Sequence, residues 1–359
     1  MKRDQRRNER VMAIWLLACC AVLLALILLG GATRLTGSGL SIVDWRPVTG
    51  VVPPLSEQAW DREFQMYRQS PEYQKVNRGM SLPEFKVIFW YEWAHRVLAR
   101  GLGLMFVLPL AWFWWRGYLT RKLRLLLVGL LLLGALQGYM GWFMVQSGLV
   151  DIPRVSPYRL AAHLGLALII YAAMFRIALS LLWPASSPPR PRSLLQMNRL
   201  LLVMAGTTII SGAFVAGLKA GLVYNTFPLM AGRWVPEGLL YLEPAWRNFF
   251  ENPATVQFTH RVLGLSTLAA VLAAWGCSRL GSNHRRGRRV LDAVLAVALV
   301  QVGLGIATLL QFVPTGLAIF HQAGAVILLS AILVADHQLR REPATNESEV
   351  LPEPDPAPG

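Results

Sequence analysis

The chain has 359 residues, of which 54% are hydrophobic and only 15% are charged, and its mean hydropathy is +0.42. This composition excludes an ordinary soluble domain and requires apolar runs long enough to cross a bilayer. The net charge of +15 and the pI near 10.4 would suit a nucleic-acid-binding protein. However, the basic residues cluster between apolar runs, so membrane topology and contact with anionic lipid explain the charge. We therefore expect membrane lipid as a partner and no nucleic acid.

Eight apolar runs are about as long as the roughly 20-residue helix that crosses the hydrocarbon core of a bilayer. Because lipid offers no partner for open backbone groups, we expect each run to be a helix. Their approximate ranges are 11–31, 87–115, 123–145, 160–183, 200–217, 256–277, 290–310 and 317–335. The first run follows basic residues, as in a signal peptide, but it is long and lacks a clear cleavage site. We interpret it as a retained span.

The distribution of Lys and Arg predicts the orientation of these spans. Positive charge gathers before the first run and after the second, fourth and sixth runs. Since short cytoplasmic segments carry the positive excess, the fold class is an all-α multi-pass protein with both termini in the cytoplasm. We expect it in a bacterial cytoplasmic (inner) membrane. Residues 1–10 are then a cytoplasmic basic tail, and the acidic, Pro-rich segment 338–359 is a disordered tail.

Two long segments on the opposite, outer side carry structure signals of their own. Ser56 precedes an amphipathic pattern, and Ser81-Leu-Pro-Glu84 is typical of a helix start that leads into the second span. In the second segment, Trp234, Trp246 and Phe249 are expected interfacial anchors.

The three cysteines, Cys19, Cys20 and Cys277, all lie within apolar runs rather than in an outer loop. We therefore expect small core residues and no structural disulfide.

The sequence also repeats itself. The segment Glu92-Trp-Ala-His-Arg-Val-Leu98 returns as Gln257-Phe-Thr-His-Arg-Val-Leu263, an offset of 260 − 95 = 165. Further matches are His163 with His321, Gln137 with Gln301, Gly141 with Gly305, and Gly31 with Gly212. The repeat predicts two tandem four-helix bundles, 11–183 and 198–337, joined by a Pro-rich cytoplasmic linker at 184–197. Because four spans separate the repeated units, the pseudo-two-fold axis runs along the membrane normal and the repeat is parallel.

Four histidines lie near the same end of the even-numbered spans, in the outer half of the membrane: His95, His163, His260 and His321. Ionisable residues at membrane depth are costly and mark functional sites. One such histidine is more often packed or hydrogen-bonded, but four at one depth in a repeat indicate axial ligands of a metal. Zinc sites use more closely spaced ligands, whereas two imidazoles per bundle suit haem. His284 and His337 lie in basic surroundings, and we interpret them as surface residues.

Glu92 distinguishes the two halves. It precedes His95 by three residues and shares its helix face, whereas the matching position in the second half is Gln257. An unpaired carboxylate in an apolar site can exchange protons, so we expect chemistry in the N-terminal half and a permanent cofactor in the C-terminal half. The alternative is that Glu92 simply bonds an interhelical partner or an arginine.

Arginines accompany the histidines. Arg96 and Arg261 directly follow two of them, and Arg34, Arg100 and Arg159 lie near span ends. A guanidinium can hold a haem propionate through paired hydrogen bonds, or its side chain can extend to the lipid headgroups. Both interpretations stay open for these residues.

Several motifs resemble the haem A synthase family. They are Gly30-Gly-Ala-Thr-Arg-Leu-Thr-Gly-Ser-Gly-Leu-Ser41, Asp44-Trp-Arg-Pro-Val-Thr-Gly50, Glu92-Trp-Ala-His-Arg-Val-Leu98, Ala162-His-Leu164, Gln257-Phe-Thr-His-Arg261 and Phe320-His-Gln-Ala-Gly324. The resemblance covers about residues 11–337 and fits the alphaproteobacterial and mitochondrial branch, because the outer segments lack the cysteine pair of the other bacterial branch.

The resemblance implies an oxidoreductase that acts on a CH group, converting the C8 methyl of haem O to a formyl group by two successive hydroxylations. The product, haem A, serves cytochrome c oxidase. The resemblance also implies a permanent haem b on His260 and His321, substrate haem near His95 and His163 on the periplasmic side, and Glu92 as the functional carboxylate. Haem O synthase, oxidase assembly factors and a second copy of the chain are the partners it suggests.

Two other functions remain open from the sequence. A di-haem b-type electron-transfer cytochrome needs the same four histidines but no catalytic carboxylate. A haem transporter would release its haem chemically unchanged.

Overall fold

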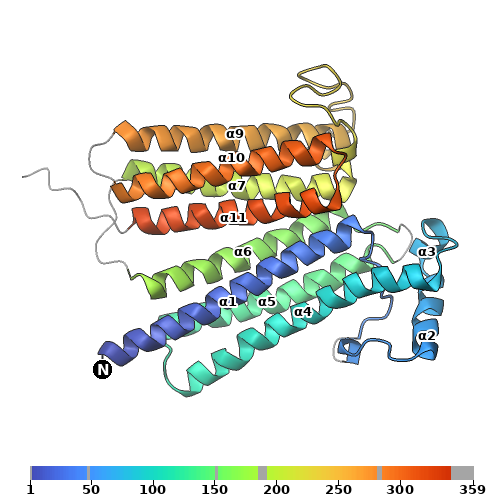
Figure 1. Ribbon diagram of the computed structural model, residues 1–359, viewed down its shortest axis with the longest axis horizontal. Helices are drawn as coiled ribbons and strands as arrows, with labels where there is room; N and C mark the ends of the chain where they lie inside the picture. The colour runs from blue at the N-terminus through green and yellow to red at the C-terminus, as the bar shows by residue number, and fades with distance from the viewer. Residues whose placement is uncertain (1, 47–48, 150–152, 185–191, 281–284, 341–359) are drawn as a thin grey trace, which may run out of the picture.

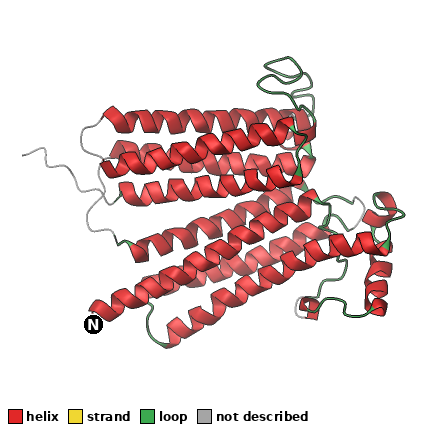
Figure 2. Cartoon of the chain, in the orientation of Figure 1, coloured by secondary structure: helices red, strands yellow, loops and turns green. Residues whose placement is uncertain are grey.

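The computed structural model describes all residues except 1, 47–48, 150–152, 185–191, 281–284 and 341–359, and the described residues are helices joined by loops (Figures 1 and 2). Eight of these helices are long and apolar enough to cross a membrane. They are α1 Lys2–Leu35, α4 Leu82–Trp115, α5 Arg121–Gln146, α6 Pro157–Leu182, α7 Arg192–Leu218, α9 Pro253–Leu280, α10 Arg285–Leu310 and α11 Thr315–Leu339. The prediction of an all-α protein with eight membrane spans is confirmed.

Short helices gather at one end of these spans, which we call the loop-bearing end (Figure 1). They are η1 Thr49–Val51, α2 Glu57–Arg68, α3 Pro71–Lys75, η2 Ala220–Leu222, η3 Ala245–Arg247 and α8 Asn248–Glu251. Local sequence sets the starts of α2 and α4. The Ser56 hydroxyl accepts a hydrogen bond from Ala59 N at the start of α2. The Glu84 carboxylate accepts hydrogen bonds from both N and Oγ of Ser81 at 2.8 and 2.7 Å, so both predicted caps are present.

Several helices extend past the apolar runs. Helix α1 begins at Lys2, so residues assigned to a basic tail continue the first span, and α7 begins at Arg192, inside the predicted linker. The rest of that linker and most of the acidic C-terminal tail lie outside the described residues. Hydropathy cannot show such extensions, because charged residues end an apolar window without ending a helix.

The spans form two neighbouring groups (Figure 1). The N-terminal group contains α1, α4, α5 and α6, and its apolar core includes Leu16, Phe106 and Leu127. The C-terminal group contains α7, α9, α10 and α11, with a separate core that includes Leu291 and Ile332. Contacts of α6 with α7, and of α11 with α1 and α6, join the two groups.

Polar contacts along α11 join the two groups at three levels. They are Gln322 Nε2 to the Ile27 carbonyl (3.0 Å), Tyr171 OH to Ser330 Oγ (2.8 Å) and Arg176 Nη1 to Asp336 Oδ2 (3.1 Å). The first lies near the loop-bearing end and the last near the opposite end of α11. We call this set the α11 seam.

The cysteine predictions are partly wrong. Cys19 and Cys20 are buried as expected, but Cys277 is exposed on α9. The sequence does not show which face of an apolar span packs inward. Cys277 lies on an outward face of α9. The predicted anchors Trp234, Trp246 and Phe249 are exposed at the loop-bearing end.

Candidate functional site

The four histidines lie toward the loop-bearing end on α4, α6, α9 and α11, and none is exposed. The rings of His260 and His321 are neighbours in a T-shaped arrangement, with centroids 6.4 Å apart and planes at 88°. A metal–imidazole bond is about 2 Å long and a ring centre lies about 1 Å behind its nitrogen, so two rings on one metal ion have centres about 6 Å apart. The separation of this pair therefore allows both rings to hold one metal ion.

Both rings of this pair are held through Nδ1. Ser211 Oγ lies 2.8 Å from Nδ1 of His260, and Gln301 Nε2 lies 3.1 Å from Nδ1 of His321. Gln301 also donates to the His321 carbonyl at 2.9 Å. A ring held at Nδ1 presents Nε2 to a ligand, in the way that outer partners orient the ligands of metal sites.

The N-terminal pair is held differently. His95 and His163 lie close enough for their charges to interact, and the Leu26 carbonyl lies near the His95 ring. Gln137 Nε2 donates to the His163 carbonyl at 3.1 Å. However, Nδ1 of His95 and Nδ1 of His163 are buried without a hydrogen-bond partner in the described part of the chain. Gln137 Nε2 lies 3.4 Å from Nε2 of His163, so the N-terminal rings are contacted at other atoms than the C-terminal pair.

One glycine from a neighbouring helix packs against each histidine ring. A Cβ added at Gly30, Gly141, Gly212 or Gly305 would lie 3.0, 3.2, 3.1 or 2.8 Å from Cε1 of His95, His163, His260 or His321, respectively. A side chain at any of these positions would displace the ring, so close approach explains the glycines. Gly30 and Gly212 therefore have equivalent positions in the two halves. The sequence comparison had matched Gly212 with Gly31 instead.

Glu92 is buried and fully engaged. Its carboxylate accepts hydrogen bonds from Ser41 Oγ (2.7 Å) and Ile42 N (2.9 Å), and it pairs with Arg96 at 2.6 Å. The expectation that this carboxylate is unpaired is therefore wrong. The chain between α1 and α2 folds back onto α4 and supplies two of its donors. Three donors stabilise the negative charge of Glu92.

The second half has an amide at the corresponding place. Gln257 Nε2 donates to the Tyr224 carbonyl at 3.1 Å, and Arg261 donates to the carbonyls of Tyr224 and Thr226 at 2.7 and 2.8 Å. Arg96 likewise donates to the Ile42 carbonyl at 3.0 Å. Both arginines thus hold a loop against the end of a span, and the halves differ in the carboxylate of Glu92.

The remaining arginines also bind backbone carbonyls. Arg34 donates to Gly217, Arg100 to Arg46 and Arg159 to Phe143, at 3.1, 2.8 and 2.6 Å. Contact of any of these arginines with a propionate stays a prediction.

The two histidines interpreted as surface residues have different outcomes. His284 lies outside the described residues. His337 is half-buried, and its Nε2 lies 2.9 Å from the Trp183 carbonyl in an exposed position, so it is a surface residue with a partner at the end of α6. The sequence gives no sign of this contact.

The sequence analysis missed most partners of the site. Ser41, Ile42 and Ser211 received no role, although Ser41 ends one of the quoted motifs. Gln137 and Gln301 were matched in the repeat, and that match was an available signal, because each lies four residues before the glycine that contacts a histidine.

Comparison with known proteins identifies the family of the chain. The family model described as "Cytochrome oxidase assembly protein" (COX15-CtaA) matches residues 13–333. The chain belongs to this family. It is similar to "Heme A synthase" of Nitrosospira multiformis, with 50% identity over 345 residues that cover 95% of the chain and 97% of that protein. "Heme A synthase" of Rhodospirillum centenum is 49% identical, covering 92% and 89%, and human "Heme A synthase COX15" is 47% identical, covering 93% and 84%. The eight spans and the family together make the chain a multi-pass membrane protein.

Proposed function

We propose that the chain is a haem A synthase, an oxidoreductase that converts the C8 methyl of haem O to a formyl group by two successive hydroxylations. The observation that carries this proposal is the 47–50% identity, over more than nine-tenths of the chain, to proteins with that name. Family membership does not favour an electron-transfer cytochrome or a haem transporter. The product, haem A, would supply cytochrome c oxidase.

The C-terminal histidine pair suits the permanent haem b. The 6.4 Å separation of the His260 and His321 rings allows both to ligate one iron, and their Nδ1 contacts fix their orientation. When bound there, haem b supplies one-electron redox chemistry. Ser211 and Gln301 hold the ligands that set its environment.

The N-terminal pair suits a haem that must arrive and leave. In the described part of the chain, Nδ1 of His95 and Nδ1 of His163 have no hydrogen-bond partner, in contrast to the C-terminal pair, and we assign the substrate haem to this less constrained pair. Glu92 lies one helical turn from His95 with its negative charge stabilised by Arg96. We assign Glu92 the role of stabilising positive charge at the reacting methyl carbon or of accepting its proton.

Haem analysis tests the proposal. Membranes that make only haem O should gain hydroxylated and formyl haem, measured by mass spectrometry of extracted pigment, when this chain is added. The Glu92→Gln variant should give no formyl haem, whereas Ser41→Ala, which keeps the carboxylate and loses one of its donors, should retain product. Unaltered haem O with the parent chain would overturn the proposal and favour a carrier or transporter.

Location and partners follow from the same assignment. We propose that the chain lies in the bacterial cytoplasmic membrane with both termini in the cytoplasm and the loop-bearing end toward the periplasm, on the distribution of basic residues. Haem O synthase and oxidase assembly factors are the proposed partners. Protease accessibility in vesicles of known orientation tests the placement, because cleavage in the 219–252 segment from the cytoplasmic side would contradict it.

A further inference from the structure

One turn of α1 lies between the two pairs of histidines. Gly30 on this turn packs against the ring of His95 in the N-terminal pair. The next residue, Gly31, meets the other half of the molecule, because a Cβ added there would overlap Oε1 of Gln322. Gln322 directly follows His321 of the C-terminal pair. A single step along α1 therefore separates a contact of one pair from a contact of the residue next to the other pair.

The side chain of Gln322 is bound to this same turn. Its Nε2 donates to the Ile27 carbonyl at 3.0 Å, which is the first contact of the α11 seam. The carbonyl of Leu26, one residue earlier, lies near the His95 ring. Gln322 thus holds the turn 27–31, which touches His95, against the residue that adjoins His321.

The matching crossing of α6 with α7 is apolar at this place. Leu164 directly follows His163, so it takes the place of Gln322 in the repeat. It packs on a buried cluster that contains Ala213, the residue that takes the place of Gly31. The molecule therefore has two equivalent crossings between its histidine pairs, and they differ in the amide side chain that is bound across one of them.

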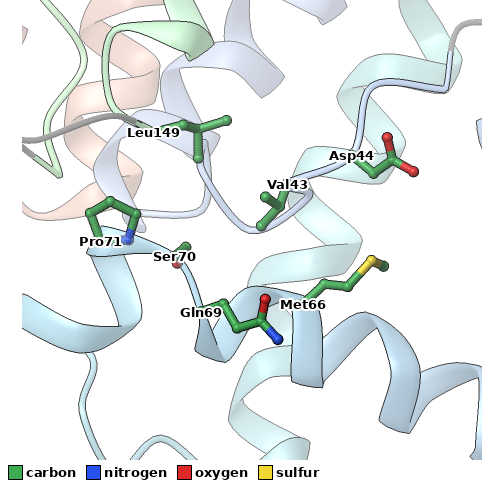
Figure 3. A pocket seen from close by; sticks show the side chains of 7 residues that line it. All are labelled: Val43, Asp44, Met66, Gln69, Ser70, Pro71 and Leu149. Carbon is green, nitrogen blue, oxygen red and sulfur yellow. The ribbon is translucent and has the colours of Figure 1, made fainter.

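The cavity shown in Figure 3 is separate from this crossing. It has a volume of about 340 Å³ and is lined by residues of the segments 43–44 and 66–71 and by Leu149. Among the described residues, its lining includes neither Gln322 nor any of the four histidines. The contacts that join the two pairs are those of packed side chains and one hydrogen bond.

A polar contact between two spans can also serve stability alone. The α11 seam contains such a contact farther along, where Tyr171 OH lies 2.8 Å from Ser330 Oγ. Neither of these two residues adjoins a histidine of the site. Gln322 differs from them because its backbone continues from His321 and its side chain binds the turn that touches His95.

We propose that Gln322 is a positioning residue that couples the two histidine pairs, so that occupancy of the N-terminal pair changes the properties of a haem held by the C-terminal pair. The inference rests on the proposed function, which makes both pairs haem sites. A haem bound at His95 sets the position of that ring and of the turn 27–31 against it. Gln322 transmits this change to His321. Such coupling is reciprocal and typically changes an affinity by about 5–150-fold.

A redox titration of the purified holoprotein tests the coupling without measuring turnover. Gallium protoporphyrin is the probe for the N-terminal pair, because gallium keeps its charge while the haem on His260 and His321 is reduced. In the parent, the affinity for the probe should differ about fivefold or more between the oxidised and reduced protein, which appears as a shift in the midpoint potential of that haem. The shift should be absent in His95→Ala. Equal potentials with and without the probe in the parent would overturn the proposal.

Three variants locate the coupling. Gln322→Leu introduces the residue of the matching crossing and should lose most of the shift. Gly31→Ala keeps every polar group but displaces the Gln322 side chain, so it should lose most of the shift as well. Ser330→Ala breaks another contact of the α11 seam and is the matched control, which should keep the shift. Any direct effect of the probe's charge is the same in all three, so equal shifts in Gln322→Leu and Ser330→Ala would refute the coupling.

Haem O oxidation by the parent separates this proposal from the proposed function. If the parent makes haem A but its potential does not respond to the probe, the coupling fails and the proposed function stands. If the parent makes no haem A and still shows a shift that Gln322→Leu loses, the proposed function fails and the coupling is supported.

Discussion

The buried ion pair of Glu92 and Arg96 gives a prediction whose size follows from the structure. The two side chains are 4% and 12% exposed, and their charged atoms are 2.6 Å apart. Solvent-exposed ion pairs contribute about 0–1 kcal/mol to the free energy of unfolding, but this pair is buried. Removing one partner should therefore lower the free energy of unfolding by about 3–5 kcal/mol. Arg96→Gln leaves Glu92 with the Ser41 hydroxyl and the Ile42 amide, so its cost should be near 3 kcal/mol. Glu92→Gln leaves the guanidinium with the Ile42 carbonyl and the face of Trp45, so its cost should be nearer 5 kcal/mol.

A double-mutant cycle measures this coupling. The variant with both substitutions should cost less than the sum of the single changes, by about 3 kcal/mol, because neither charge is left unpaired. Hydrogen exchange of the Ile42 amide, which donates to Glu92, reports the local free energy of opening. The exposed pair of Arg233 and Glu237 has the same i,i+4 spacing and a 2.7 Å separation, and should couple by less than about 1 kcal/mol. A Glu92–Arg96 coupling as small as that of the control would refute the reasoning.

Three further variants probe the C-terminal histidine pair. Gly305→Ala places a Cβ 2.8 Å from Cε1 of His321. Overpacking of this kind costs about 1–3 kcal/mol and displaces the ring, so the purified protein should retain less haem. Gly303→Ala meets no atom within 4 Å and is the control, and equal haem content in both would contradict this expectation. Ser211→Ala removes the hydroxyl 2.8 Å from Nδ1 of His260 and should speed haem loss to a scavenging protein about tenfold or more. An unchanged rate would show that this contact does not hold the ligand. His260→Ala should lose the haem that we propose for this pair and most activity, and full haem occupancy would mean that another residue is the ligand.

The sequence predicts the membrane architecture well because its physical signals are local. The length of an apolar run decides whether a helix can cross a bilayer, and the caps at Ser56 and Ser81 use residues at most three positions apart. The start of α1 at Lys2 escaped prediction, because charged first turns have no apolar signal. The exposure of Cys277 escaped for a related reason, since an all-round apolar helix does not show which side packs.

Only some residues of the candidate site could be predicted from the sequence, because many of its contacts join segments that are far apart in the chain. The histidines and the contrast between Glu92 and Gln257 stand out as single residues in a repeat. Their partners depend on contacts between distant segments, such as Ser41 with Glu92, which are 51 positions apart. Gln322 belongs to a quoted motif, but only the fold shows that its side chain contacts α1.

The α11 seam limits how the molecule can move. Membrane carriers that work by alternating access rock one bundle against the other around a central ligand. Here a rocking motion would have to break polar bonds at three depths together, and each buried group left unsatisfied costs about 1–3 kcal/mol. The α11 seam therefore makes a rocking motion of the two groups costly and disfavours alternating access as the way this chain works.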